Sequence, residues 1–224
     1  MGWPEKLVLV RHAESEGNVL SIEERPKFEC SAHGYGLTDR GKKQAEITGK
    51  YLREQFGAFD AYYVSYYQRA RDTLKIMYPG VKVFEDSRLA EAQRGIYHTM
   101  THDEIEAKFP EELKRKEREG LYHYRPWGGE NWADVELRIH SFLGTLSRDF
   151  EGQKVLVVVH GHWLVMLQKL LEHFPVEEAL ERYKTGIVKN ASVNVYNAAN
   201  VNGKSRLVRG ISNFAPWEKE LAQV

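Results

Sequence analysis

The stretch LVLVRHAESEGN, residues 7–18, joins a short apolar run to a cluster of polar side chains. A second stretch, VLVVVHGH at residues 155–162, has the same form. Short apolar runs rich in β-branched side chains are typical of strands buried on both faces of a parallel sheet. We therefore expect both polar clusters to lie at the carboxyl edge of one sheet, where α/β proteins bind their ligands.

Other segments have the composition of strands. β-Branched and aromatic residues indicate strands at Ala61–Val64 and Val193–Tyr196, with weaker candidates at Val81–Phe84 and Arg206–Ile211. The dipeptide at 202–203, Asn-Gly, is the preferred sequence of a two-residue hairpin turn, so the last two strands are expected to pair directly.

Helical periodicity fills the segments between the strands. Thr38 is a suitable N-cap for a helix that ends near Gly57, and Asn131 is a suitable N-cap for a longer amphipathic helix. A capping box at 101–104 precedes a short helix that we expect Pro110 to stop. Strands that alternate with helices predict an α/β fold, a three-layer sandwich with a largely parallel central sheet flanked by helices.

Size and composition limit the classes of protein that remain. The chain has 224 residues, of which 42% are hydrophobic, so we expect a single domain over 1–224 with a helical lid or insert around 97–130. The 32 basic and 32 acidic residues balance, which gives no support for a nucleic-acid partner. Cys30 is the single cysteine, the segment Met1–Lys6 lacks the apolar core of a secretory signal, and no apolar run is long enough for a bilayer. We therefore expect a cytoplasmic protein with no membrane partner.

The two strand ends carry residues suited to phosphate chemistry. A neutral histidine such as His12 or His160 can attack phosphorus with one ring nitrogen while the other donates to a fixed acceptor. The planar guanidinium of Arg11 matches phosphate oxygens, and Arg69 follows the second strand at the start of a helix. Several donors are needed because charge spreads over the phosphoryl oxygens in the transition state.

Nine residues in a row, VRHAESEGN at 10–18, resemble the signature of the histidine phosphatase superfamily, phosphoglycerate-mutase-like branch. Further motifs in the order of that family span most of the chain: LTDRGKKQA at 37–45, Ser65 with Arg69, Ala70 and Thr73, LAE at 89–91 with Gly95, GGE at 128–130 with Asp134, Val135 and Arg138, and VHGH at 159–162. One of these motifs alone is a weak signal, but together they are specific.

This resemblance implies a role for each site residue. His12 becomes the phosphohistidine, and Arg11, Arg69 and His160 surround the phosphate. Glu91 is the general acid for the leaving alcohol and then the base for water, for which we expect a pKa raised toward working pH. Four further residues are expected to bind substrate: Ser15, Asn18, Gly161 through its backbone amide, and His162.

Other chemistries fit the sequence less well. His98 and His102, or His160 and His162, have spacings seen in metal pairs, but no further ligands complete a zinc shell. The resemblance implies no metal and no other cofactor, because the arginines supply the positive charge. Cys30 lacks the arginine that a cysteine-type phosphatase loop requires, since position 36 is glycine.

Two reactions remain open for the expected site. The segment after Glu91 and the basic residues Lys114-Arg115-Lys116 depart from the pattern of cofactor-dependent phosphoglycerate mutases, so hydrolysis of a small-molecule phosphomonoester is favoured. The mutase is the alternative, and a family member without turnover that binds phosphate as a scaffold is the third. A wide pocket near Tyr66, Arg94 and Trp127 is expected to hold the leaving group, and the oligomeric state stays open.

Overall fold

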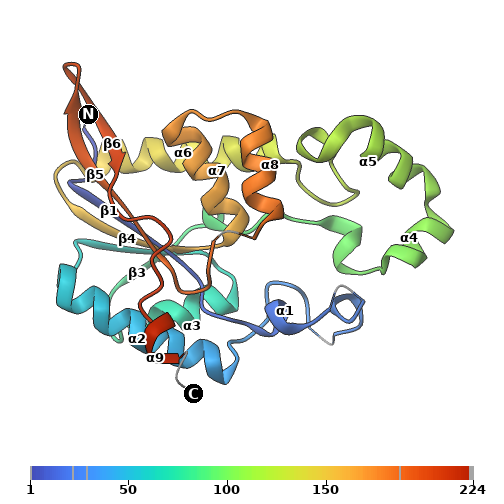
Figure 1. Cartoon of the computed structure of the whole chain (residues 1–224), viewed down its shortest axis with the longest axis horizontal. Helices are drawn as coiled ribbons and strands as arrows, with labels where there is room; N and C mark the ends of the chain where they lie inside the picture. The colour runs from blue at the N-terminus through green and yellow to red at the C-terminus, as the bar shows by residue number, and fades with distance from the viewer. Residues whose placement is uncertain (1, 22, 29, 187, 222–224) are drawn as a thin grey trace.

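The computed structural model describes residues 2–21, 23–28, 30–186 and 188–221, so Met1 of the segment considered as a signal lies outside it. Within that part of the chain, one mixed sheet has the strand order β3-β2-β4-β1-β5-β6 (Figure 1). Its strands are β1 Lys6–Arg11, β2 Ala61–Val64, β3 Val83–Glu85, β4 Lys154–Val159, β5 Val193–Val201 and β6 Lys204–Arg209.

The sheet is parallel in its centre, as predicted. β1 pairs with β4, β4 with β2 and β2 with β3 in parallel, whereas β5 and β6 are antiparallel additions at one edge. The predicted hairpin turn is confirmed, because Asn202 and Gly203 both have positive φ between the paired residues Val201 and Lys204. This turn fixes the start of β6 at Lys204, so the predicted strand 206–211 began and ended two residues late.

Helices cover both faces of the sheet. Two of them, α2 (Asp39–Phe56) and α3 (Gln68–Met77), lie on one face, and α6 (Trp132–Asp149), α7 (Gly161–Glu172) and α8 (Val176–Lys184) lie on the other (Figure 1). The short α9 (Glu218–Leu221) follows Trp217, whose ring lies under the Arg40 guanidinium of α2 at 5.6 Å. These three layers confirm the predicted α/β sandwich.

The interior positions of the central strands β1 and β4 are all apolar, because these strands divide their side chains between two cores. Leu7 and Leu9 of β1 belong to the core under α6 and α7, whereas Val8 and Val10 belong to the core under α2 and α3. All four side chains are fully buried, each worth about 1.5–3 kcal/mol relative to exposure. β4 alternates in the same way, so a shift of either strand by one residue would exchange the two sets.

Most of the remaining elements gather at one end of the sheet, on the right of Figure 1. They are α1 Glu16–Val19, η1 Arg25–Lys27, η3 Gly95–His98, α4 His102–Lys108 and α5 Pro110–His123, whereas η2 Ser87–Leu89 packs against α6. The expectation that Pro110 stops a helix is confirmed: α4 ends at Lys108, and Phe109, before the proline, is not helical. Pro110 is also the first residue of α5. Proline suits this position because its fixed φ is helical and no partner is needed for its nitrogen. Among the described residues, no helix is long and apolar enough to cross a bilayer.

Candidate active site

The two site histidines lie side by side because their strands are paired in parallel. Arg11 is opposite Val159 in the β1–β4 ladder, so the next residues, His12 and His160, leave the sheet together. The backbone N–H of His12 donates to the Val159 carbonyl at 2.8 Å, and the two imidazole rings are 5.1 Å apart between centroids. Both side chains are buried. The predicted meeting of the two strand ends is therefore observed.

The contacts of His12 define its tautomer. Nδ1 lies 2.8 Å from the Ala13 carbonyl oxygen, which can only accept, so Nδ1 carries the hydrogen. Arg69 Nε donates to His12 Nε2 at 3.1 Å, so Nε2 keeps its lone pair. Burial, with the charges of Arg69 and Arg11, holds the pKa of His12 well below its usual range. The result is a neutral imidazole whose unprotonated nitrogen faces a guanidinium, which is the form a nucleophile requires.

Arg69 joins the two histidines. Its Nη2 lies 3.2 Å from His160 Nδ1, which must accept because a guanidinium only donates. His160 Nε2 then carries the hydrogen and donates to Ser65 Oγ at 2.8 Å. The third nitrogen of Arg69, Nη1, donates to the Ala32 carbonyl at 2.8 Å. From the sequence, Ser65 was recognised only as part of a motif. In the structure its hydroxyl accepts from His160 and fixes the orientation of that ring.

Arg11 lies against the first turn of α7. A Cβ atom on Gly161 would be 3.3 Å from Arg11 Nε, so glycine leaves room for the guanidinium. Arg11 Nη1 donates to the Val188 carbonyl, whereas its buried Nε has no hydrogen-bond partner among the residues described. That N–H is therefore available to an anion.

Glu91 accepts hydrogen bonds from the start of α7. Its Oε2 accepts from the His162 amide at 3.3 Å, and Oε1 accepts from the Trp163 amide at 3.3 Å and the Ala92 amide at 3.1 Å. Burial raises the pKa of Glu91, but the side chains of His162 and Arg69 and these amides outweigh it and lower the pKa overall. The expectation of a raised pKa is therefore wrong for the protein without ligand, because His162, Arg69 and the amide donors together stabilise the carboxylate.

A cavity of about 250 Å³ contains most of the predicted residues. The described side chains that line it include the six predicted ones Arg11, His12, Ser15, Asn18, Arg69 and Glu91. Gly161 and His162 instead line a smaller hollow of about 140 Å³ that shares Arg11 and Glu91. His160 is not among the described lining residues of either hollow and reaches the site through Arg69.

Ser15 and Asn18 form one wall of this cavity. Asn18 Oδ1 accepts from the amide and the hydroxyl of Ser15, both at 3.0 Å, and from Asn190 Nδ2 at 3.2 Å. Asn190 also donates to the His12 carbonyl at 3.1 Å. Because Oδ1 takes these bonds, the NH2 group of Asn18 is the part left to donate to a ligand.

His162 lies in an aromatic hollow of about 350 Å³ next to the cavity. Its ring centroid is 4.3 Å from that of Trp132 and 5.0 Å from that of Tyr183, and burial lowers its pKa to about 4. Arg94 lines both spaces, as expected. The expectation for Trp127 is wrong: its side chain is half exposed and is not among the described residues that line either space.

Residues of the Gly-Gly-Glu motif support the site without lining the catalytic cavity. Glu130 Oε2 accepts from the Gln93 amide at 3.0 Å, and the Glu130 amide donates back to the Gln93 carbonyl at 2.8 Å. Arg138 Nε donates to Glu130 Oε1 at 2.9 Å. This ion pair holds the loop that follows Glu91, a purpose that sequence alone did not suggest.

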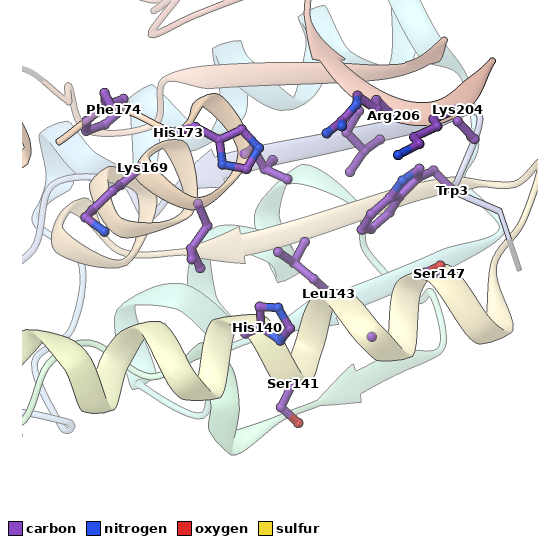
Figure 2. A pocket seen from close by; sticks show the side chains of 15 residues that line it. Trp3, His140, Ser141, Leu143, Ser147, Lys169, His173, Phe174, Lys204 and Arg206 are labelled. Atoms are coloured by element: carbon purple, nitrogen blue, oxygen red, sulfur yellow. The ribbon is translucent and has the colours of Figure 1, made fainter. Parts of the chain in front are cut away.

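Other polar clusters lie apart from this chemistry. A hollow of about 990 Å³ lies between α6, α7 and β6, and Figure 2 shows its labelled side chains, among them Trp3, Lys169 and Arg206. His102 lies on the exposed face of α4 with Asp103 and Glu106, their ligand atoms within 4.8 Å of one another. His98 belongs to η3 instead, so it and His102 do not share a helix. Exposed acidic groups of this kind are common on helices, and we assign no metal to them.

Comparison with known proteins agrees with this geometry. Residues 7–209 match the histidine phosphatase superfamily (branch 1). A 2,3-bisphosphoglycerate-dependent phosphoglycerate mutase from Rhizobium rhizogenes is 33% identical over 181 residues, 78% of this chain and 82% of that enzyme. Bacillus stearothermophilus YhfR superposes with a TM-score of 0.74 at 26% identity, over 93% of this chain and 96% of its own.

A mycobacterial glucosyl-3-phosphoglycerate phosphatase shares the fold with a TM-score of 0.67 at 24% identity, over 94% of this chain and 99% of its own. The buried neutral histidine, its arginine partners and the match over most of the chain point the same way. This chain belongs to the histidine phosphatase superfamily, whose members transfer phosphoryl groups through a phosphohistidine.

Proposed function

We propose that this protein hydrolyses a small phosphomonoester through a phosphohistidine on His12. The observation that carries the proposal is the state of His12: a buried neutral ring with Nδ1–H bonded to the Ala13 carbonyl and the Nε2 lone pair beside Arg69. A nucleophile of this kind in a cavity lined by arginines is suited to attack on phosphorus.

The first step forms the His12 Nε2–P bond as the P–O bond to the leaving group breaks. Arg11 and Arg69 neutralise the charge on the phosphoryl oxygens, with the Asn18 side-chain NH2 and the Gly161 amide as further donors. His160 and Ser15 act by holding Arg69 and Asn18 in place. Protonated Glu91 gives its hydrogen to the leaving alcohol. In the second step Glu91 takes a proton from water, which attacks phosphorus and releases inorganic phosphate from His12.

Entry of the substrate supplies the protonation that Glu91 requires. The carboxyl group is ionised in the protein without ligand because its pKa is lowered. A phosphate dianion next to it favours the neutral acid, because two like charges in one site disfavour ionisation of both. His162 lies beside the leaving group in this proposal, and the helices of residues 97–130 form the lid over it.

Hydrolysis is supported over mutase activity by two basic residues of α5, Lys114 and Arg115. Mutases of this family are expected to use a pair of arginines in the helical insert. Here Arg115 donates to the Arg125 carbonyl and to Glu112, and Lys114 pairs with Glu111, so neither is used at the cavity. The mutase nevertheless remains the second candidate, because relatives at about a third identity are named as such.

The test is release of inorganic phosphate from a panel of phosphomonoesters in the presence of a chelator. We expect turnover without added metal, because Arg11 and Arg69 supply the positive charge. We also expect a phosphoenzyme that is stable in base and labile in acid. Both should vanish in His12→Ala and persist in His140→Ala, an exposed histidine of α6 outside the cavity.

Three outcomes distinguish the candidates. Phosphate release that depends on His12 supports the phosphatase. Interconversion of phosphoglycerate isomers with little release identifies the mutase instead. Phosphate binding without a phosphoenzyme from any substrate contradicts both reactions. It supports the third alternative, a family member without turnover that binds phosphate.

A further inference from the structure

Tyr67 is a buried side chain that lines the catalytic cavity and has no part in the reaction steps described above. It is the N-cap residue of α3, and Arg69 is the second residue of that helix. The centre of the Tyr67 ring is 4.5 Å from the Arg69 guanidinium carbon and 4.9 Å from the centre of the His160 ring. The ring therefore packs against the residues that hold the phosphate.

The hydroxyl group of Tyr67 reaches the segment that follows Glu91. Its oxygen accepts a hydrogen bond from Gln93 Nε2 at 2.9 Å. The backbone of Gln93 is in turn held by Glu130 through two hydrogen bonds. Tyr67 thus connects two parts of the cavity, with its ring beside Arg69 and its hydroxyl group on the side of the general acid.

The hydrogen of this hydroxyl group is not used by the chain. The side-chain NH2 group of Gln93 can only donate, so the Tyr67 oxygen accepts and its own hydrogen stays free. Among the residues that the structure describes, none accepts a hydrogen bond from it. Burial raises the pKa of Tyr67, so the hydroxyl group stays neutral and keeps its hydrogen. A buried donor without an acceptor is available to a ligand in the cavity.

The position of this donor indicates which atom it serves. Attack on phosphorus is in line, so the oxygen that leaves and the water that replaces it lie opposite His12 Nε2. Glu91 must reach the same oxygen in order to transfer protons. In the proposed reaction the phosphoryl oxygens face Arg11 and Arg69, whereas the Tyr67 hydroxyl group is held by the segment next to Glu91. The donor is therefore on the side where the water binds.

We propose that the Tyr67 hydroxyl group positions the water that hydrolyses the phosphohistidine. This inference rests on the proposed phosphoryl transfer at His12 and adds a residue to its second step. The water accepts from Tyr67 and donates to the Glu91 carboxylate, which leaves a lone pair directed at phosphorus. As the O–P bond forms and the P–Nε2 bond breaks, Glu91 takes the proton of water, His12 recovers its lone pair, and Tyr67 keeps its hydrogen.

A contact with the water affects the two chemical steps differently. Formation of the phosphoenzyme from p-nitrophenyl phosphate needs little help at the leaving oxygen, because p-nitrophenolate is a stable anion. Hydrolysis of the phosphoenzyme depends on how the water is placed. Loss of the Tyr67 hydroxyl group should therefore slow the second step and spare the first.

The experiment measures the two steps separately in Tyr67→Phe, which keeps the ring and its contact with Arg69. Rapid mixing with p-nitrophenyl phosphate gives the rate constant of phosphoenzyme formation from the release of p-nitrophenolate. Rapid removal of substrate, followed by quenching in base at successive times, gives the rate constant of phosphoenzyme hydrolysis. We expect hydrolysis to slow by about tenfold, the value of one hydrogen bond, and formation to change by less than about threefold. The phosphoenzyme should accumulate in the steady state as a result.

Tyr66→Phe is the matched control. The hydroxyl oxygen of Tyr66 accepts from the same Gln93 Nε2, at 3.2 Å. Contrary to the expectation from sequence, Tyr66 is not among the described residues that line the catalytic cavity or the aromatic hollow. The variant therefore removes a comparable hydrogen bond to Gln93 outside the cavity, and it should leave both rate constants unchanged.

The outcomes separate this inference from the proposed function. A loss confined to phosphoenzyme hydrolysis, and found in Tyr67→Phe alone, supports the water-positioning role. Unchanged hydrolysis overturns it, and so does an equal loss in both steps, which would place the hydroxyl group at a phosphoryl oxygen. The same loss in Tyr66→Phe would also overturn it, because the orientation of Gln93 would then be the cause. Absence of any phosphoenzyme that depends on His12 overturns the proposed function itself.

Discussion

The Arg69 guanidinium fixes two histidines at once, which no lysine could do. Its Nε and Nη2 are directed to His12 and His160, while Nη1 is held by the Ala32 carbonyl. A rigid fork of donors is needed to span two rings, whereas an ammonium is a single flexible point charge. Each contact also assigns a tautomer, so the protonation pattern of the site follows from one side chain.

Glu91 is the residue whose protonation should govern the rate with poor leaving groups. We expect Glu91→Gln to lower turnover of alkyl phosphates by about 10²–10⁴-fold, the usual value of general acid catalysis. p-Nitrophenyl phosphate should lose much less in the first chemical step, because its leaving group departs as a stable anion. Steady-state and single-turnover rates for both substrates measure the difference.

The pH dependence follows from the direction of the pKa shift. The acid form of Glu91 is lost as pH rises through its lowered pKa, so kcat/KM, which reports the free protein, should fall first. Bound substrate raises the pKa, so the corresponding limb of kcat should lie at higher pH. Equal losses for both substrates in Glu91→Gln, with unchanged limbs, would contradict the acid–base role.

At the scale of elements, the loop that carries the site is packed against the start of α2. The Thr38 amide donates to the Glu14 carbonyl at 3.1 Å, and a Cβ on Gly41 would lie 1.9 Å from that same oxygen. The glycine therefore permits a close approach between a helix and the loop after β1. A larger residue at position 41 would push α2 away from Glu14. It would therefore affect both the stability of α2 and the position of the next residue, Ser15.

Gly41→Ala should destabilise the protein despite the better helix propensity of alanine. We expect a loss of about 1–3 kcal/mol, since the added methyl must move backbone. Gly144→Ala in α6 is the matched control, because a Cβ there meets nothing within 4 Å. That variant should gain about 0.5–1 kcal/mol. Urea unfolding of both proteins decides the matter, and equal effects of the two substitutions would rule out the close-packing argument.

Element boundaries were predicted well where a local signal exists. Thr38 and Asn131 cap α2 and α6 as expected, because their side chains accept from the amides of Gly41 and Asp134. The proline at 110 ends α4 as predicted, and the same residue also begins α5, because its fixed φ suits a first helical turn.

For the whole molecule, the sequence predicted the sheet because its signals are local and strong. Continuous apolar strands and a recognisable family signature placed His12 and His160 at one edge. The contributions of Ser65 and Glu130 were not predicted, because they depend on contacts between segments far apart in sequence. The pKa of Glu91 was misjudged for the same reason, since the two side chains that lower it most, His162 and Arg69, come from α7 and α3.

The division of burial between the two ends of the cavity should appear in hydrogen exchange. Residues Leu7–Val10 and Val155–Val159 are fully buried, whereas α4 contributes one buried side chain, Ile105, and η3 contributes none among its described residues. Amides of β1 and β4 should therefore exchange only through global unfolding. Those of η3 and α4 should exchange through local opening, which has a lower free energy. Uniform protection across these segments would contradict this view.

The two functions of the cavity would then have different thermal limits. The nucleophile is attached to the strands that open last, and the helices of residues 97–130, proposed to cover the leaving group, open early. On warming, the protein would lose its selectivity between substrates before it loses catalytic activity. Over that range of temperature it would accept a wider set of phosphomonoesters.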